Sequence, residues 1–302
     1  MKIIEPKVEL LSELNISPES HIARCARTCY GREYKEPNQE TDKKMVDGLI
    51  KRKHLSMLRH SSVYLYHTED LPAYLKWRII HSPYWNNDAE EGAFNSNYGF
   101  ASTNLQEFNN FEKLVKSEAD GDAISAINEK DFLEECHIYD VLFRLYRLTF
   151  CITTQDAIAK ELNRKSPNAI AEKSTRYCNF KDGIEICKPW WWTAKMGKLS
   201  VSDIVSFPVK EKKAAISWKE AEKAYAGLLD EGMKPEDARD VLPKALATKV
   251  IYTYSVKEWE DILALRLYDK TGPAHPDCHI VMQMVKDHIN NFAKEHNIDY
   301  QV

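Results

Sequence analysis

The stretch ATKVIYTYSVKEWEDILALR, residues 247–266, sets the expected fold. Its first part, Ala247–Ser255, is rich in β-branched and aromatic residues and predicts a strand. The apolar spacing that follows predicts one helix over about 256–267 and another over about 276–296. Strand and helix are therefore interleaved at this end of the chain.

Upstream of this stretch, predicted helices outnumber strands. A strand is expected over Ser62–His67, while 82–121 is aromatic and amide-rich without a regular period and is expected to hold loop and short helix. Ser17 and Thr41 are placed to cap the first two of the predicted helices. Because strands are few, we expect the α+β class rather than a doubly wound parallel sheet. Apolar residues at helical spacing predict helices over 18–30, 38–53, 68–80, 132–150, 154–164 and 217–231.

Length and charge narrow the classes of function. The chain has 302 residues, which suits one large domain with additions or two modest domains. Its 42 Lys and Arg against 46 Asp and Glu give a net charge of -4, which argues against nucleic acid or an anionic membrane as a partner. A small charged molecule, held by a local cluster of cations, stays open.

The cysteines and the N-terminus indicate a cytoplasmic protein. Seven scattered cysteines without a CxxC pair argue against a disulfide framework. Charged residues such as Glu5 and Lys7 interrupt any signal-peptide core, and no stretch approaches the roughly 18 apolar residues that a membrane helix needs.

The densest group of polar residues lies at 161–177, ELNRKSPNAIAEKSTRY. The helix that precedes it is expected to break at Pro167, which leaves cations at the helix end and Arg176 on the loop beyond. A guanidinium binds phosphate through two parallel hydrogen bonds, so this loop can form an anion pocket. The alternative is a solvated loop with cations biased toward a helix C-terminus.

Other candidate residues each have a plain structural alternative. Arg239 is flanked by acids in the segment 236–243 and suits a local ion-pair network as well as a ligand. Arg266 ends an apolar helix face, where an arginine often only extends its head group to water. His54 and His60 border a loop before a strand and suit a general base, a hydrogen-bond donor or a surface histidine.

Common cofactor signatures are missing from the sequence. There is no GxGxxG, Walker loop, GxSxG or HExxH. His275 and His279 are spaced to share a helix face, but no partner cluster is obvious, so we expect no metal site. Trp190–Trp192 cannot all face one way, and core or subunit interface is the expected role for at least two of them.

Taken in order, these segments resemble the flavin-dependent thymidylate synthases. The family patterns are an A-R-x-x-Y-like segment, H-x-S-x-x-E-H, R-H-R with a later Ser and R-Y, A-R-x-V-L-P, and a closing L-x-L-R. The matching segments are Ala26–Tyr30, His54–His60, Arg164–Tyr177, Ala238–Pro243 and Leu263–Arg266. The resemblance implies a thymidylate synthase-complementing-protein-like fold: one domain over 1–302, built on a mixed sheet with a helical subdomain. The resemblance also implies an insertion at about 69–145.

The sequence departs from the family pattern on the flavin side. Lys165 and Ser166 replace the second and third residues of R-H-R. Loss of the second arginine removes one positive charge and a planar guanidinium that can form two parallel hydrogen bonds. Arg59 replaces a family Glu, and Asp261 stands where an Asn commonly contacts flavin.

The resemblance implies that the protein converts dUMP to dTMP. Methylenetetrahydrofolate would donate the carbon and reduced FAD the hydride, with NADPH as a further co-substrate. Arg266 would be catalytic, stabilising negative charge as the uracil ring is activated. The nucleotide would be bound by Glu161, Arg164, Ser174, Arg176, Arg239 and Arg266. The flavin side would be lined by His54, Lys165, Ser166, Glu172 and Asp261.

The resemblance also implies a homotetramer whose sites are shared between subunits. The charge balance leads us to expect no nucleic-acid or membrane partner. Two alternatives stay open. The protein can be a related enzyme that adds a hydroxymethyl group to C5 of a pyrimidine nucleotide, or a homologue that binds the nucleotide without turnover.

Overall fold

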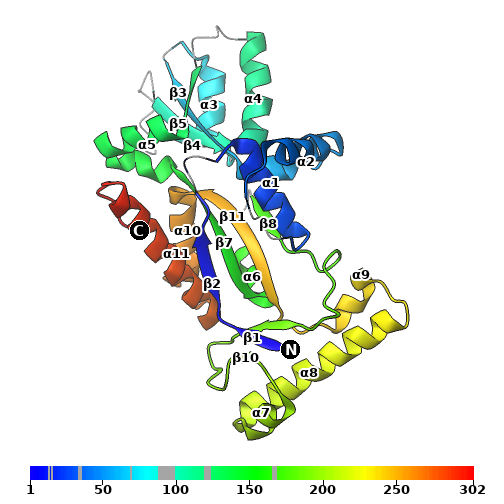
Figure 1. Ribbon diagram of the computed structural model, residues 1–302. Coiled ribbons are helices and arrows are strands. Elements are labelled where there is room, and N and C mark those ends of the chain that lie inside the picture. Colours follow the sequence, from blue (N-terminus) through cyan, green and yellow to red (C-terminus); the bar gives the residue numbers. More distant parts are fainter. Residues whose placement is uncertain are drawn as a thin grey trace.

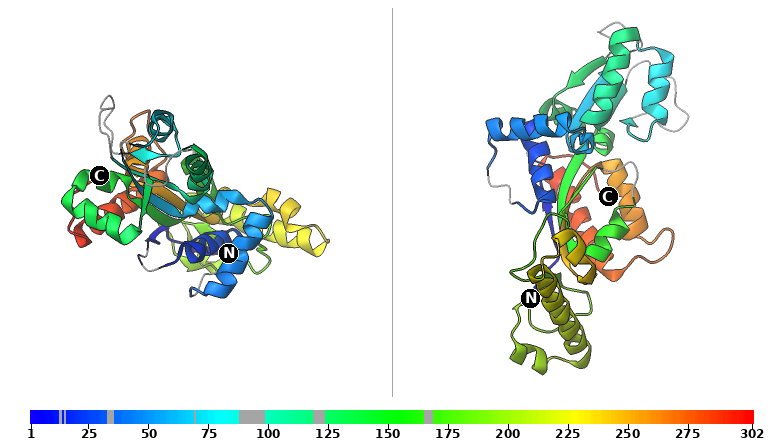
Figure 2. Two further views of the ribbon diagram at one scale, coloured as in Figure 1. Left: turned by 90° about the horizontal axis from the view of Figure 1, so that it is seen from above. Right: turned by 90° about the vertical axis from the view of Figure 1, so that its right-hand side faces the viewer.

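The computed structural model describes residues 1–302 except 13, 15, 33–35, 69, 88–98, 119–123 and 165–168. The described residues form three sheets in an elongated molecule (Figure 1, Figure 2). The elements, with 3-10 helices labelled η, are β1 (Lys2–Ile4), β2 (Lys7–Leu10), α1 (Pro18–Cys29), α2 (Gln39–Lys51), η1 (Leu55–His60), β3 (Ser62–His67), α3 (Ala73–His81), β4 (Asn86–Asn87), β5 (Gly99–Asn104), α4 (Leu105–Glu118), β6 (Ile124–Ile127), α5 (Glu129–Ile138), η3 (Asp140–Leu145), β7 (Arg147–Gln155), α6 (Asp156–Leu162), β8 (Ile170–Glu172), β9 (Glu185–Cys187), β10 (Gly197–Lys198), α7 (Val201–Ser206), α8 (Val209–Asp230), α9 (Pro235–Ala238), η4 (Arg239–Val241), β11 (Ala247–Ser255), α10 (Val256–Arg266) and α11 (Pro276–Glu295).

The main sheet lies at the centre of the molecule and has the strand order β2-β7-β11-β8, all antiparallel. Its two long strands pair along their whole length, from Ala247 opposite Gln155 to Ser255 opposite Arg147. The mixed α+β class expected from the sequence is confirmed.

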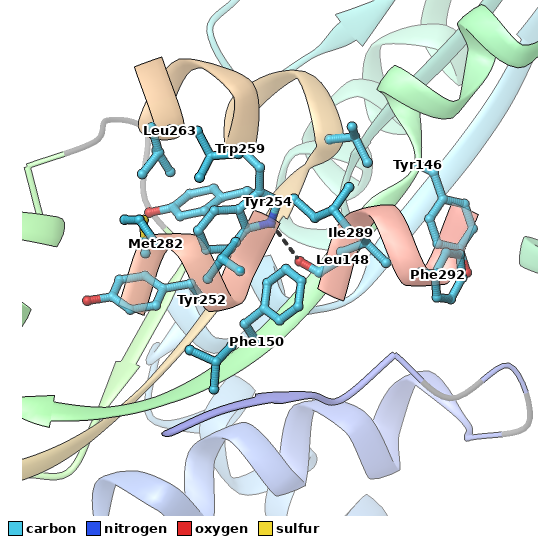
Figure 3. Packing of buried hydrophobic residues seen from close by; sticks show 14 of the residues in the cluster. Tyr146, Leu148, Phe150, Tyr252, Tyr254, Trp259, Leu263, Met282, Ile289 and Phe292 are labelled. Carbon is cyan, nitrogen blue, oxygen red and sulfur yellow. Dashed lines mark hydrogen bonds between the residues drawn. The ribbon is translucent and has the colours of Figure 1, made fainter. Parts of the chain in front are cut away.

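One face of the main sheet packs against α10 and α11 to form the largest core. Phe150 of β7 and Tyr252 of β11 meet Trp259 of α10 edge to face, with ring centroids 5.1 and 6.3 Å apart (Figure 3). Trp259 Nε1 donates to the carbonyl of Leu148 at 3.2 Å and so ties α10 to β7. Burial of each such side chain stabilises the fold by roughly 1.5–3 kcal/mol.

The opposite face of the main sheet is covered by α1 only in part. Side chains alternate along a strand, so the neighbours of Tyr252 and Phe150, namely Ile251 and Cys151, point to this second face. There they pack with Cys25 of α1. The rest of this face is polar.

A second lobe is built on the sheet β4-β5-β3-β6. Leu65 of β3, Leu75 of α3 and Phe111 of α4 are fully buried in its core. Tyr64 of β3 points the other way, stacks on Phe132 with ring centroids 4.4 Å apart and accepts a hydrogen bond from the Arg147 backbone at 3.0 Å. β3 therefore joins this lobe to the main sheet.

A third lobe, at the other end of the molecule, contains the small sheet β10-β1-β9 and the helices α7–α9 (Figure 1). Trp192 is buried against Trp218 of α8, with ring centroids 5.4 Å apart. Trp191 is partly buried in the same cluster, whereas Trp190 is exposed. The core role expected for at least two of these three tryptophans is confirmed.

The helix predicted over 132–150 is wrong beyond Ile138. α5 ends at Ile138, and the chain then forms η3 and the fully buried strand β7. Both faces of β7 are buried, and the apolar residues before it recur at helical spacing, so spacing alone did not mark the change from helix to strand. Within 82–121, the expected loop is also wrong in part, because β5 and the long helix α4 lie there.

The ends of the observed helices and strands differ from the predicted ends more often than their types differ from the predicted types. The side chain of Asn38, rather than the predicted Thr41, caps α2 by accepting from the Thr41 backbone at 3.0 Å. α8 begins at Val209, directly after Pro208, and is longer than the predicted 217–231. The strand Ser62–His67 and the strand Ala247–Ser255 are confirmed with the predicted bounds.

Candidate functional site

The matched polar residues gather around α6, β8 and the loop that follows β8. α6 follows β7 directly, and β8 pairs with β11, so Glu172 lies opposite Val250. The alternation of side chains along β8 turns Glu172 toward α6. α6 therefore stands between Glu172 and the end of α10, where Arg266 lies.

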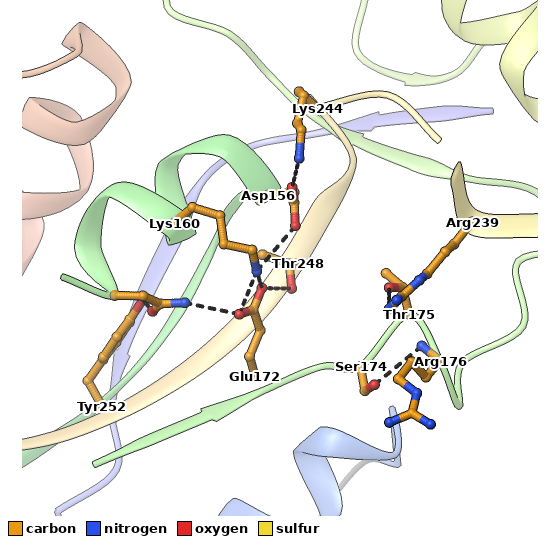
Figure 4. Close-up of polar contacts among 11 residues, drawn as sticks. Asp156, Lys160, Glu172, Ser174, Thr175, Arg176, Arg239, Lys244, Thr248 and Tyr252 are labelled. Carbon is orange, nitrogen blue, oxygen red and sulfur yellow. Dashed lines mark hydrogen bonds and ion pairs between the residues drawn. The ribbon is translucent and has the colours of Figure 1, made fainter. Parts of the chain in front are cut away.

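The carboxylate of Glu172 is held by three side chains (Figure 4). Lys160 Nζ donates to both of its oxygens, at 2.7 and 2.8 Å, and Asn163 Nδ2 donates at 3.1 Å. Thr248 Oγ1 donates at 3.5 Å. Tyr252 in turn donates its hydroxyl hydrogen to Asn163 Oδ1 at 2.7 Å, which fixes the amide orientation. Glu172 is thus held in place.

Lys160 bridges two acids. Besides Glu172, its ammonium lies 3.4 Å from Asp156, which also pairs with Lys244 at 3.0 Å (Figure 4). Burial opposes the charge of Lys160, but the hydrogen bond and attraction of Glu172 outweigh it and hold the pKa of Lys160 above its ordinary value. Lys160 therefore stays cationic at neutral pH.

Arg266 pairs with Glu161. Its Nη1 lies 3.4 Å from Glu161 Oε1, and the two side chains are only 20% and 24% exposed. Arg266 is the last residue of α10, where a cation is favoured by the helix dipole. Burial, to which Glu161 adds, raises the pKa of the neighbouring Cys278 thiol to about 12, so this cysteine is not a nucleophile.

The loop after β8 carries the second group of matched residues. The Ser174 backbone donates to the Cys29 carbonyl at 3.0 Å, which fastens the loop to the end of α1. The Ser174 hydroxyl oxygen accepts from the Arg176 backbone at 3.3 Å. Arg239 Nη1 donates to Thr175 Oγ1 at 3.3 Å, so Arg239 reaches this loop from η4 (Figure 4).

The local ion-pair network that the acids around Arg239 suggested is not what forms. Glu236 instead pairs at 3.2 Å with Arg176, which is distant in sequence. The loop after β8 therefore carries Ser174 and Arg176, and the Arg239 guanidinium contacts the same loop at Thr175. Such a set suits an anionic group of a ligand.

The remaining candidates are separated. Arg164 is exposed directly after α6, His54 is exposed before η1, and Asp261 is exposed on α10. Lys165 and Ser166 lie outside the described residues. His54 lies before η1, Glu172 on β8 and Asp261 on α10, so these three flavin-side candidates come from separate elements.

Sequence reasoning missed Lys160, Asn163 and Tyr252, which hold Glu172. One signal was present: a carboxylate on a strand of the main sheet needs a cationic or hydrogen-bonding partner. Several cations lie at similar distances in sequence from Glu172, and only the packing of α6 on the sheet selects Lys160.

His275 and His279 have structural partners. His275 accepts from the Asp277 backbone and caps α11, while His279 lies 2.8 Å from Asp269. In the part of the chain that the structure describes, no group of three or more His, Cys, Asp or Glu residues could hold a metal ion. No helix of the described residues is long and apolar enough to span a membrane.

Comparison with known proteins identifies the family. A model of the family described as thymidylate synthase complementing protein matches residues 100–293. The chain therefore belongs to the thymidylate synthase complementing protein family, the flavin-dependent thymidylate synthases, and the resemblance seen in the ordered motifs is confirmed.

Solved structures to which the chain is similar include two of a UMP/dUMP methylase, PolB, from Streptomyces cacaoi. One is bound with 5-Br dUMP (15% identity, covering 97% of this chain and 93% of that chain) and one with 5-Br UMP (14% identity, 97% and 91%). The TM-score is 0.41 in both cases. A comparison with curated proteins found no match.

Proposed function

We propose that the protein is a methyltransferase that converts dUMP to dTMP, with methylenetetrahydrofolate as carbon donor and reduced FAD as hydride source. The observation that supports this proposal is the family match over residues 100–293, within which Arg164, Ser174 and Arg176 keep their order. NADPH would reduce the flavin. The free state of all seven cysteines supports a cytoplasmic location for this activity.

Arg176, Arg239 and Ser174 bind the phosphate of the nucleotide in this proposal. Arg176 lies on the loop after β8 and pairs with Glu236, and Arg239 reaches this loop from η4 through Thr175. A phosphate dianion carries more charge than the Glu236 carboxylate and, unlike the Thr175 hydroxyl, makes a charge-assisted contact.

Arg266 carries the chemical step in this proposal. Its guanidinium is half-buried, and its contact with Glu161 is long at 3.4 Å. Placed against the uracil ring, it stabilises the negative charge that develops as C5 becomes nucleophilic, and its effect is greatest where water is excluded. Glu161 holds the guanidinium in position until the nucleotide binds.

The flavin side is the less complete part of the proposal. Reduced flavin would supply the hydride that turns the transferred carbon into a methyl group. His54, Glu172 and Asp261 come from three separate elements, and we propose that the flavin site is shared between subunits of a homotetramer. We further propose that residues 1–302 form one domain with an insertion at about 69–145.

The decisive experiment combines a spectrum with product analysis. The purified protein is examined for flavin absorbance with and without added FAD, and then incubated with dUMP, methylenetetrahydrofolate and NADPH. We expect flavin absorbance and dTMP, identified by mass. Absence of flavin binding, together with no product, would count against the enzyme and favour the non-catalytic homologue. A hydroxymethylated product from dUMP or dCMP would establish the related enzyme instead.

Two arginine variants test the assigned roles. We expect Arg266→Ala to abolish turnover with a smaller loss of nucleotide binding. Arg176→Ala is expected to weaken the binding of dUMP by about 1.5–3 kcal/mol, the usual contribution of a charge-assisted hydrogen bond. Arg144→Ala is the control, because Arg144 also pairs with a glutamate, Glu260, and neither residue is assigned to the site. Normal turnover by Arg266→Ala would remove its proposed role.

A further inference from the structure

The carboxylate of Glu172 is fully occupied by groups of its own chain. A carboxylate has two oxygens with about four lone pairs between them. Lys160 Nζ donates to both oxygens, at 2.7 and 2.8 Å. Asn163 Nδ2 donates to one of them at 3.1 Å, and Thr248 Oγ1 donates to the other at 3.5 Å. A ligand that needs a hydrogen bond to Glu172 must therefore displace one of these donors.

Asn163 connects Glu172 to the main core. Because its Nδ2 donates to Glu172, its Oδ1 is left to accept from the Tyr252 hydroxyl at 2.7 Å. Tyr252 is 2% exposed, and its ring centroid lies 6.1 Å from that of Tyr254 and 6.3 Å from that of Trp259 (Figure 3). A side chain packed in this way has little freedom to move. The Tyr252 hydroxyl is therefore a fixed anchor for the Asn163 amide.

The two ends of this chain of contacts lie on the same face of the main sheet. Glu172 of β8 lies opposite Val250 of β11, and Tyr252 is two residues beyond Val250. Side chains two residues apart on a strand share a face. Since β8 and β11 are paired by backbone hydrogen bonds, the spacing between Glu172 and Tyr252 is set by the sheet.

The contacts converge on the last turn of α6. This helix has seven residues, and a helix so short is not stable without tertiary contacts. Lys160 lies in its last turn, Asn163 is its C-terminal cap, and the exposed Arg164 follows directly. The direction in which Arg164 leaves the helix therefore depends on how Lys160 and Asn163 are held.

We propose that Tyr252 is a positioning residue that acts through Asn163 and Glu172. These three residues form a clamp that fixes the last turn of α6 and so sets the direction of Arg164, which would contact the nucleotide. Glu172 then serves the site through α6 and not by direct contact with flavin, which revises the role that the resemblance implies for it. The nucleotide contact of Arg164 rests on the proposed function, whereas the clamp itself does not.

Tyr254 supplies a matched control. It lies on the same face of β11, is 1% exposed, and its hydroxyl has no hydrogen-bond partner among the described residues. Tyr252→Phe and Tyr254→Phe each remove one buried hydroxyl and keep the ring in the core. Only Tyr252→Phe breaks the clamp.

Amide hydrogen exchange of the ligand-free protein tests the clamp. Mass spectrometry of a peptide over residues 156–164 reports the opening of α6. In Tyr252→Phe we expect exchange there to be roughly 2-fold to 10-fold faster, the range for the loss of one neutral hydrogen bond. Tyr254→Phe is expected to exchange at the wild-type rate, and thermal unfolding shows that each variant is folded. Equal rates in the two variants would overturn the proposal.

Calorimetric titration with dUMP tests the positioning role. Tyr252→Phe is expected to bind dUMP roughly 2-fold to 10-fold more weakly than Tyr254→Phe does. In an Arg164→Ala background, where the positioned guanidinium is gone, Tyr252→Phe is expected to cause no further loss. A variant that only loosens the fold would weaken binding equally in both backgrounds, so additive losses would overturn the role.

Glu172→Gln separates positioning from direct contact with flavin. We expect faster exchange in α6 and weaker dUMP binding, with an affinity for FAD equal to that of the wild type in a titration of flavin absorbance. Weaker FAD binding in Glu172→Gln, but not in Tyr252→Phe, would make Glu172 a flavin contact and overturn its assignment to the clamp. If the wild type binds neither dUMP nor FAD, the proposed function fails, and hydrogen exchange alone decides whether the clamp exists.

Discussion

At the scale of single residues, His60 shows how burial fixes a protonation state. It is 1% exposed, and its Nδ1 lies 2.9 Å from Thr253 Oγ1, while its Nε2 has no hydrogen-bond partner among the described residues. Burial, followed by the nearby His21, lowers the pKa of His60 to about 3. His60 is therefore neutral in the folded protein at all moderate pH values, and it is better described as a core residue than as a general base.

His60 predicts a loss of stability in acid. Below its ordinary pKa of about 6.5 the unfolded chain binds a proton that the folded chain does not, so the stability is complete above that pH. It then falls by about 1.4 kcal/mol per pH unit as the pH drops from about 6.5 toward 3. In His60→Gln this slope is expected to be smaller by that amount, measured by urea unfolding between pH 7 and pH 4. His137→Gln, at an exposed position, is the control, and an unchanged slope in His60→Gln would contradict the assignment.

At the scale of elements, two helices begin with the same capping arrangement in different surroundings. Ser255 accepts from the Glu258 backbone at 3.1 Å at the start of α10, and both residues are buried. Ser200 accepts from the Asp203 backbone at 3.1 Å at the start of α7, where the contact is exposed. The two capping hydrogen bonds have the same length, so the two caps differ mainly in how far they are buried.

Removal of the two caps is expected to have unequal effects. Ser255→Ala leaves a buried N–H without a partner and is expected to destabilise the protein by about 1–2 kcal/mol, whereas water replaces the lost contact in Ser200→Ala, for which about 0.5 kcal/mol is expected. The midpoints of urea unfolding measure both. Equal losses would show that burial does not control the strength of these caps.

At the scale of the whole molecule, the candidate residues occupy separate elements of an elongated chain. Arg266 lies at the end of α10 and Arg176 on the loop after β8, and each is paired with a different glutamate. A nucleotide site that needs both arginines can form within one chain only if their side chains point into the same pocket. If the site is shared between subunits, each arginine can come from a different chain.

Mixing two inactive variants tests a shared site. We expect Arg266→Ala and Arg176→Ala chains, unfolded together in equal amounts and refolded, to regain about one quarter of the wild-type activity, because that fraction of shared sites receives both arginines from intact positions. Each variant refolded alone is the control. No recovery in the mixture would place both arginines of a site in the same chain.

Much of the fold could be predicted because local pattern and tertiary role agree. β11 and α10 follow each other with clear periods and a capping serine, and the strand Ala247–Ser255 keeps its predicted bounds. β7 was harder to predict, because the helical spacing of apolar residues before it continues into the strand. Its core-facing residues Leu148, Phe150 and Ile152 lie on the face opposite to that of Thr149 and Thr153, and this alternation is short.

The sequence by itself determined the family, because the order of matched residues such as Arg164, Ser174 and Arg266 survives without any knowledge of contacts. Only the tertiary structure decided which cation holds Glu172 and which face of the sheet each residue of 172–173 meets. Charge interactions act through space over a few ångströms, so their partners are set by the packing of α6 and α1 on the sheet rather than by distance along the chain.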